Sequence, residues 1–183
     1  MYEEAVRIPM IVAGPDIPEG KKVDALTSIV DIYPTLLDFY NLKQDEREKK
    51  LPGISLKDTI EGKAIDNRTI YSEYFSVGYA HSVFMVRKEQ YKLVYYVGHD
   101  VCQLFDLIKD PDELHDLGAI PDYADKVKEL KEELYRIADP EKLDEESLKD
   151  QAIMVEERGG IEHILASRKS GCVPFTPVPE GFI

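Results

Sequence analysis

Two adjacent cations, Arg87 and Lys88, are the first residues in this chain whose chemistry suggests a binding site. A pair of positive side chains can attract an anion, and a net charge of -13 means that any anion site needs such local cations. In an alternating strand, however, the two side chains point to opposite faces, so one of them is solvated. A salt bridge or a free surface charge is therefore the alternative at Arg87. Arg7 is expected to tie a loop to Glu3 or Glu4.

Metal chemistry has weaker support in the sequence. The histidines at positions 99, 115 and 163 do not share the spacing of metal ligands. The acids between Asp110 and Asp116 resemble a calcium loop in composition, but they lack its alternating spacing and its glycine. We therefore predict a turn and a helix-capping region there. Within this chain the sequence predicts no metal site.

The two cysteines, Cys102 and Cys172, lie far apart in the sequence. They could form one disulfide, but two cysteines establish neither a disulfide nor an oxidising compartment. The compartment stays open, with the cytoplasm slightly favoured. No Cys-x-x-Cys pair is present, so we expect no structural zinc site.

Composition describes a globular chain with room for one domain or two small units. Of 183 residues, 43% are hydrophobic and 32% are charged, which excludes a largely disordered chain. Apolar runs such as Met10–Ala13 are too short to span a membrane, and no charged leader followed by an apolar stretch predicts a signal peptide. The acid excess argues against a nucleic-acid partner, because such binding relies on clustered Lys and Arg.

The first sixty residues predict one strand followed by helices. Ile8–Ala13 is apolar, short and closed by Gly14-Pro15, which is typical of a buried strand. Asp24–Leu42 carries apolar residues at helical spacing, with Asp24 as the expected N-cap. Pro34 should interrupt this pattern, which predicts a short helix, a bend and a second helix beginning at Pro34. A charged surface loop and a short helical turn at Leu56–Ile60 follow.

The middle of the chain predicts a small sheet covered by a helix. Tyr123–Ala138 has an apolar stripe with Lys and Glu opposite, as an amphipathic helix requires. Four short segments before it are rich in Tyr, Val and Phe, and they are too close together for parallel crossovers, so they must pair antiparallel. These strands are Thr69–Phe75, Ser82–Lys88, Lys92–Val97 and Gln103–Asp106.

Beyond residue 138 the composition shifts. Glu145–Glu157 and Ile161–Ser167 can form helices, separated by Gly159-Gly160. From Gly171 the chain holds three prolines and no helical pattern, so we expect an extended tail. Such a tail stays ordered only where it docks, which predicts contact with another subunit or with a neighbouring domain.

Six segments of the chain resemble the C-terminal portion of sulfatases of the alkaline-phosphatase-like superfamily. They occur in the family's order and with similar spacing. They are Tyr2–Val12, Val30-Asp-Ile-Tyr-Pro-Thr-Leu-Leu-Asp38, Pro52-Gly-Ile-Ser-Leu56, Tyr71-Ser-Glu-Tyr74, Met85–Tyr96 and Gln103–Leu114. Shorter pieces after residue 138, such as Asp139-Pro-Glu141 and Thr176-Pro-Val-Pro179, resemble bacterial choline-sulfatase-like members.

The resemblance implies a protein in two parts. A large α/β domain would hold a formylglycine, made from the first residue of a Cys-x-Pro-Ser-Arg motif, and a calcium ion bound by Asp and Asn. Cys172-Val-Pro-Phe-Thr176 departs from that motif at Phe175 and Thr176, and it lies at the wrong end of the chain. Calcium and formylglycine are therefore expected in an upstream region.

The resemblance also implies where substrate could be touched. In related sulfatases the loop that enters this sheet can face the active-site mouth, which makes His81 and Tyr79 candidate substrate-binding residues beside Arg87. The alternative for His81 is a loop histidine exposed to water.

Together these observations predict an α+β fold with three parts. Residues 1–60 would be the last strand and helix of an α/β sulfatase domain, residues 61–138 a four-stranded antiparallel sheet packed on a helix, and residues 139–183 a helical segment and extended tail. The predicted function is the C-terminal part of a sulfate-ester hydrolase, inactive alone and shaping the substrate pocket. Its expected partners are an N-terminal catalytic domain, a sulfated small molecule and a possible second copy. The alternatives are a phosphonate or phosphate ester hydrolase and a non-catalytic interaction module.

Overall fold

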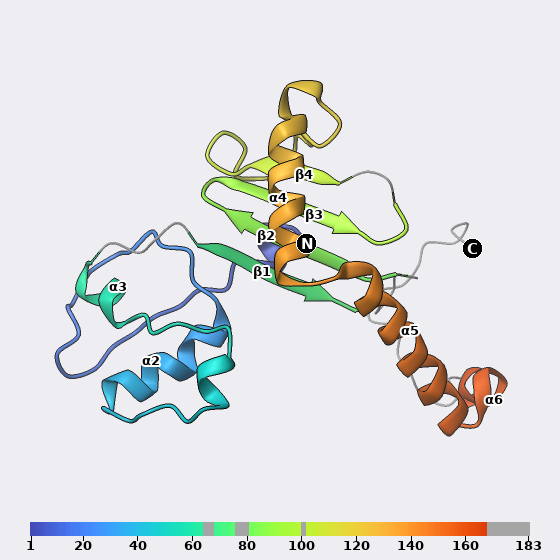
Figure 1. The fold of residues 1–183 in the computed structure, drawn as a ribbon, viewed down its shortest axis with the longest axis horizontal. Coiled ribbons are helices and arrows are strands. Elements are labelled where there is room, and N and C mark those ends of the chain that lie inside the picture. The colour runs from blue at the N-terminus through green and yellow to red at the C-terminus, as the bar shows by residue number, and fades with distance from the viewer. Residues whose placement is uncertain (64–67, 76–80, 100–101, 168–183) are drawn as a thin grey trace.

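The computed structural model describes residues 1–63, 68–75, 81–99 and 102–167, and a four-stranded antiparallel sheet lies at its centre (Figure 1). The strands are β1 (Thr69–Tyr74), β2 (Val83–Lys88), β3 (Tyr91–Tyr96) and β4 (Gln103–Asp106), in the order β1-β2-β3-β4. Each strand pairs with its sequence neighbour, because the short connections between them allow only antiparallel pairing. The predicted sheet is confirmed, with strand ends shifted by a residue at most.

Helix α4 (Ala124–Ile137) lies across one face of the sheet, as predicted for Tyr123–Ala138. A 3-10 turn, Pro121–Tyr123, leads into it. Its apolar stripe buries Leu130 and Leu134 almost completely against the sheet residues Phe84, Val86 and Leu93, among others. Each buried leucine of this kind contributes about 1.5–3 kcal/mol relative to an exposed one.

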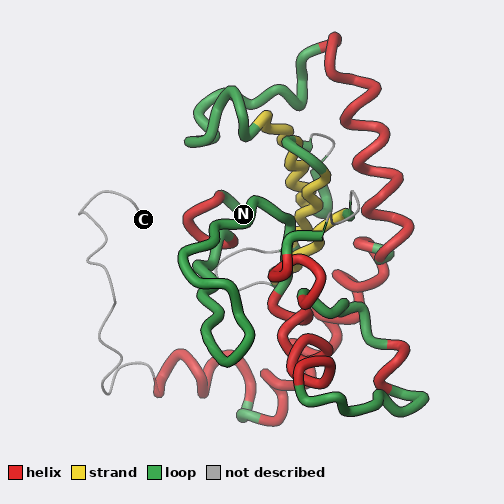
Figure 2. The backbone as a smooth tube through the Cα atoms, turned by 90° about the vertical axis from the view of Figure 1, so that its left-hand side faces the viewer, coloured by secondary structure: helices red, strands yellow, loops and turns green. Residues whose placement is uncertain are grey.

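The opposite face of the sheet is covered by the first residues of the chain. Helix α1 (Glu3–Val6) and Met1 pack against a second apolar cluster that includes Val83, Met85 and Phe105. Figure 2 shows the sheet edge-on, with α4 on one side and the N-terminus on the other. The central strands are therefore covered on both faces. On the second face Glu3 meets Glu113, which is 110 positions away in the sequence.

A buried aspartate organises the N-terminal half. The 3-10 turn Ile29–Asp31 leads into α2 (Ile32–Phe39), with Pro34 in its first turn, where a missing N–H costs little. The Asp31 carboxylate accepts hydrogen bonds from the Ser28 N–H at 2.7 Å and the Ile54 N–H at 3.0 Å. Ser28, and not Asp24, therefore precedes the helical segment. The short helix predicted before Pro34 is limited to the 3-10 turn, and the second helix begins at Ile32 rather than at Pro34. Another 3-10 turn, Glu48–Lys50, and the predicted helical turn, α3 (Lys57–Glu61), follow.

The predicted strand at Ile8–Ala13 is wrong, because these residues form a loop. Ile8 is 60% exposed and Ile11 is 93% exposed. A buried strand needs a neighbour to receive its backbone hydrogen bonds. In the described part of the chain the four strands pair only with one another, and none of them pairs with this segment.

The last described elements are α5 (Pro140–Glu157) and α6 (Gly160–Ser167), which extend away from the sheet (Figure 1). Helix α5 begins five residues earlier than predicted, because Asp139 accepts a hydrogen bond from the Lys142 N–H and Pro140 occupies the first helical position. Gly159 ends it with a positive φ of 86°. The predicted tail from Gly171 lies outside the described residues. No helix in the described ranges is both long and apolar enough to cross a bilayer.

Candidate functional site

His81, the predicted substrate-facing histidine, is oriented by a buried carboxylate. It lies just before β2, and its Nδ1 is 2.8 Å from Oδ2 of Asp144 on α5. The same carboxylate accepts a hydrogen bond from the Ser82 N–H at 2.6 Å. The Asp144 side chain is 6% exposed, whereas that of His81 is 47% exposed. The pair therefore holds the imidazole in one orientation and leaves its Nε2 as the nitrogen that can meet a ligand.

The charge of Asp144 is stabilised in place. Burial alone would raise the pKa of this carboxyl, but the hydrogen bonds from His81 and Ser82 outweigh that cost and lower the pKa below its ordinary value. Asp144 is therefore ionised at neutral pH and can accept a hydrogen bond from the ring N–H of His81. Sequence reasoning could not find this pair, because the two residues are 63 positions apart and belong to no common motif.

A cluster of two tyrosines and a glutamate fixes the beginning of α5 beside this pair. Glu141, one turn before Asp144, accepts hydrogen bonds from the hydroxyl of Tyr135 at 2.7 Å and from that of Tyr95. Lys131 lies 4.9 Å from the centre of the Tyr95 ring. Residues from β3, α4 and α5 thus meet at one end of the sheet, and their contacts hold Asp144 where His81 can reach it.

Arg87, the other described candidate, lies near the end of β2 that is remote from His81. It lines a separate hollow beside the N-terminal segment. Its Nη1 is 3.3 Å from Oε2 of Glu3, so a salt bridge forms, as the simpler alternative predicted. The expected ion pair of Arg7 with Glu3 or Glu4 is absent among the described residues, and Glu3 pairs with Arg87 instead. Because His81 precedes β2 and Arg87 nearly ends it, the structure does not bring them together. Tyr79 lies outside the described residues.

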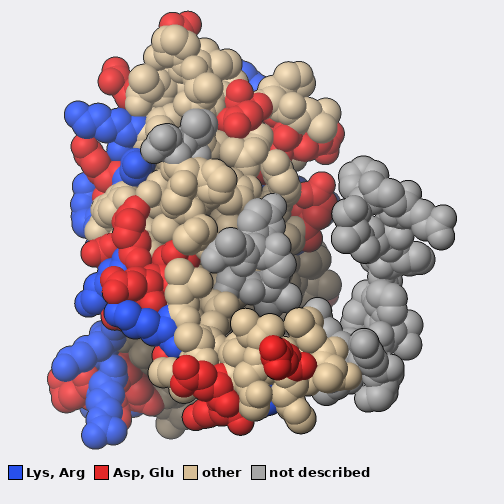
Figure 3. All heavy atoms as spheres, turned by 90° about the vertical axis from the view of Figure 1, so that its right-hand side faces the viewer, with Lys and Arg blue, Asp and Glu red and all other residues tan. Residues whose placement is uncertain are grey.

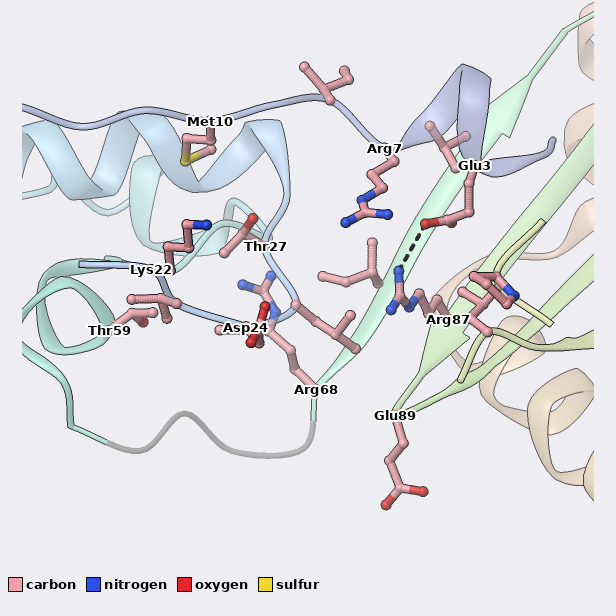
Figure 4. Close-up of a pocket in the computed structure, with 18 of the residues that line it drawn as sticks. Glu3, Arg7, Met10, Lys22, Asp24, Thr27, Thr59, Arg68, Arg87 and Glu89 are labelled. Atoms are coloured by element: carbon pink, nitrogen blue, oxygen red, sulfur yellow. Dashed lines mark hydrogen bonds and ion pairs between the residues drawn. The ribbon is translucent and has the colours of Figure 1, made fainter. Parts of the chain in front are cut away.

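A hollow of about 1140 Å³ opens between the N-terminal segment, the loop at residues 21–27 and the sheet edge at β1 and β2. Figure 4 shows Arg7, Arg68 and Arg87 entering it from three different segments, with Lys22 and Thr59 on the opposite side. The Arg68 guanidinium donates to both oxygens of Asp31, at 2.7 and 3.1 Å. This bidentate pair, in which the Asp31 carboxylate is fully buried, joins the N-terminal half to the start of β1.

The described residues do not offer the reaction centre that the resemblance implies. Within the described ranges no group of three or more His, Cys, Asp or Glu side chains is arranged to hold a metal ion. Cys102 is a buried free thiol, and burial raises its pKa, which disfavours the thiolate needed in a nucleophile. Cys172 is outside the described residues.

Comparison with known proteins agrees with this fold. Residues 1–140 match the family described as N-sulphoglucosamine sulphohydrolase, C-terminal. Arylsulfatase K of Bos taurus is 35% identical over 129 residues, which cover 65% of this chain and 23% of that protein. N-acetylglucosamine-6-O-sulfatase of Bacteroides thetaiotaomicron is 30% identical over 173 residues, which cover 86% of this chain and 30% of that protein. The chain thus spans about a quarter of the length of these relatives.

Solved structures show the same relationship. A 2-O GAG sulfatase is 28% identical with a TM-score of 0.51, and the match covers 58% of this chain and 23% of that one. A sulfatase solved with its substrate D-glucosamine-2-N,6-O-disulfate is 27% identical with a TM-score of 0.51, over 60% of this chain and 24% of that one. The chain therefore belongs to the N-sulphoglucosamine sulphohydrolase C-terminal family and is the C-terminal part of a sulfatase-like protein.

Proposed function

We propose that this chain completes an enzyme that hydrolyses sulfate esters, together with a larger catalytic domain that precedes it. Cleavage of a sulfate ester requires a nucleophile, a cation near the sulfate oxygens and an acid for the leaving alkoxide. In sulfatases a formylglycine and a calcium ion supply the first two. We assign both to the preceding domain, because the described residues contain no ligand set for the metal.

The exposed apolar surface of the N-terminal half carries this proposal. A folded chain rarely leaves a contiguous group of large apolar side chains in water, and such a surface usually meets another protein surface. Here the exposed side chains follow one stretch of sequence, and they include Ile8, Ile11, Ile29, Val30, Tyr33, Leu36 and Tyr40. We assign this surface to contact with the catalytic domain, since the relatives hold about three quarters of their length outside the matched region.

We further propose that His81 contacts the substrate in the complete enzyme. The support is its half-exposed ring, the orientation imposed by Asp144 and its position at the entrance to β2. In this role His81 binds and orients the substrate, and Asp144 acts as a positioning residue.

The reaction class is tested by steady-state kinetics of the full-length protein. We expect kcat/KM to be higher for 4-nitrophenyl sulfate or N-acetylglucosamine 6-sulfate than for a phenylphosphonate ester. Preferred turnover of the phosphonate would overturn the sulfatase assignment in favour of phosphonate ester hydrolysis. An inactive full-length protein that binds another protein through its apolar surface would instead favour an interaction module.

The role of His81 needs a matched comparison in the same protein. His81→Ala should raise KM for the sulfated sugar on the order of tenfold, which is what loss of one hydrogen bond to a charged group costs. His115, which is 79% exposed and outside this cluster, is the control, and His115→Ala should leave KM unchanged. Equal kinetic constants for the two variants would show that His81 does not contact the substrate.

A further inference from the structure

Helices α5 and α6 form an arm that leaves the sheet and projects outward (Figure 1). We call residues 140–167 the arm. Its first turn is held to the sheet and α4 by the hydrogen bonds of Glu141 with Tyr95 and Tyr135. Beyond that turn, α5 packs mainly on α6 among the described elements. The family match ends at residue 140, so the arm lies beyond the matched region.

The outer end of the arm exposes large apolar side chains. Ile161 and Leu165, one turn apart on α6, are both more than half exposed. Near the end of α5, Ile153 is also more than half exposed, and Met154 is nearly so. Because α6 packs back on α5, these side chains belong to one end of the arm. An apolar surface of this kind usually meets another protein segment.

The charge of the arm argues against a second arm as its partner. Residues 140–167 contain eight acidic and three basic side chains, a net charge of -5, so two arms repel one another. Figure 3 views the molecule from the side on which the arm projects. Lys and Arg gather mostly along the left edge of this face, whereas uncharged and acidic side chains make up most of its lower centre.

The catalytic domain is also poorly placed to cover the arm. We assign its contact to the apolar surface of the N-terminal half, which includes α2. Helix α2 lies at one end of the molecule, and the arm projects from the other (Figure 1). The segment that follows the arm in the sequence is much nearer.

That segment, residues 171–183, has the composition that the arm requires. Its three prolines favour the polyproline II conformation, which has three residues per turn. At this period Cys172, Phe175 and Val178 fall on one face. The sequence therefore presents an apolar stripe on a stiff, extended segment.

The same segment is long enough to run back along the arm. Thirteen residues in polyproline II conformation span about 40 Å. Helices α6 and α5, with eight and 18 residues, are about 12 Å and about 27 Å long. Ser170-Gly171, between α6 and the stripe, is a dipeptide typical of turns. Arg168 and Lys169 precede this turn, and their charge complements that of the acidic arm.

We propose that residues 171–183 fold back and pack along the outer end of the arm, with the stripe facing α6 and the last turns of α5. Docking removes the exposed apolar side chains of both partners from water. The prolines reduce the conformational entropy that docking costs. The segment then supports α5, which supplies Asp144 beside His81. This arrangement does not depend on the sulfatase reaction.

Disulfide trapping in the intact chain tests the proposal, because Cys172 is a natural thiol within the stripe. In Ile161→Cys a disulfide with Cys172 should form in a glutathione redox buffer. Ala166→Cys is the matched control, since Ala166 is closer to Cys172 in the sequence but points to another side of α6. We expect the disulfide to form at least about tenfold faster in Ile161→Cys, because docking raises the effective concentration of Cys172 there. Cys102 is buried and should take no part.

Substitutions in the segment provide a second comparison, made in the Ile161→Cys variant. Phe175→Ser should slow the disulfide toward the rate of Ala166→Cys, because it removes the largest side chain of the stripe. Val173→Ser changes another face and should keep the fast rate. Melting temperatures near that of the unmodified chain would show that the variants fold. Equal rates in Ile161→Cys and Ala166→Cys, or a disulfide that joins two chains instead of closing one, would overturn the proposal.

Discussion

The Nζ of Lys92, in the middle of β3, lies 2.5 Å from Oε1 of Glu113, and neither side chain is accessible to solvent to any useful extent. Glu3 approaches the same ammonium at 3.1 Å, and its other oxygen meets Arg87. The buried lysine therefore joins the N-terminal segment, the sheet and the turn after β4. This network explains why the first residues of the chain stay on the sheet although α1 is only four residues long.

Removing Lys92 should destabilise the fold strongly. Lys92→Met leaves two carboxylates near one another without their buried cation, and breaking such a pair costs about 3–5 kcal/mol. Urea denaturation of this variant and of Lys128→Met, an exposed lysine on α4, measures the difference. We expect the Lys128 variant to unfold like the unmodified chain. Similar midpoints for the two variants would mean that the Lys92 network does not stabilise the fold.

The packing of α4 on the sheet predicts a second stability difference. Leu134 is fully buried, so Leu134→Ala should cost about 2–5 kcal/mol in free energy of unfolding. Ile137, on the same helix, is 47% exposed, and Ile137→Ala should cost clearly less. Chemical denaturation measures the free energy of unfolding of both variants. A loss near zero for Leu134→Ala would be incompatible with a helix packed on this sheet.

Asp144 predicts a dependence of stability on pH. Its folded-state pKa lies below the ordinary value of 3.8, so the carboxylate stabilises the fold above that value, and this stabilisation is lost as the pH falls through the lower folded-state pKa. The free energy of unfolding of Asp144→Asn should therefore fall below that of the unmodified chain at neutral pH, and the gap should narrow in acid. A gap that stays constant between neutral and acidic pH would exclude an ionised Asp144 as its cause.

The exposed apolar side chains of the N-terminal half predict self-association of the isolated chain. Ile11 is 93% exposed and Ile29 is 59% exposed, and unpartnered apolar surface of this kind favours contact between copies. Light scattering should therefore show concentration-dependent association, reduced in Ile11→Lys/Ile29→Lys. A version ending at Ser170 tests whether the apolar tail contributes. A strictly monomeric intact chain would contradict this expectation.

The sequence predicted the sheet and α4 well, because short segments rich in Tyr, Val and Phe and a helical apolar stripe are local signals. It failed at Ile8–Ala13, whose apolar composition is that of a buried strand although no described strand pairs with it. The partners of Asp31, Lys92 and His81 were also beyond prediction, because they are set by tertiary contacts. His81 and Asp144 meet only because α5 begins early and is held by Tyr95 and Tyr135.

We propose that this chain is the C-terminal part of a sulfatase and does not catalyse hydrolysis alone, and hydrolysis of 4-nitrophenyl sulfate tests this proposal most directly. The purified chain should release no product, with or without added calcium, whereas the full-length protein should turn the ester over. The coding sequence ahead of Met1 should carry a Cys-x-Pro-Ser-Arg motif in the same frame. Turnover by the chain alone, abolished by Cys172→Ala, would contradict this account.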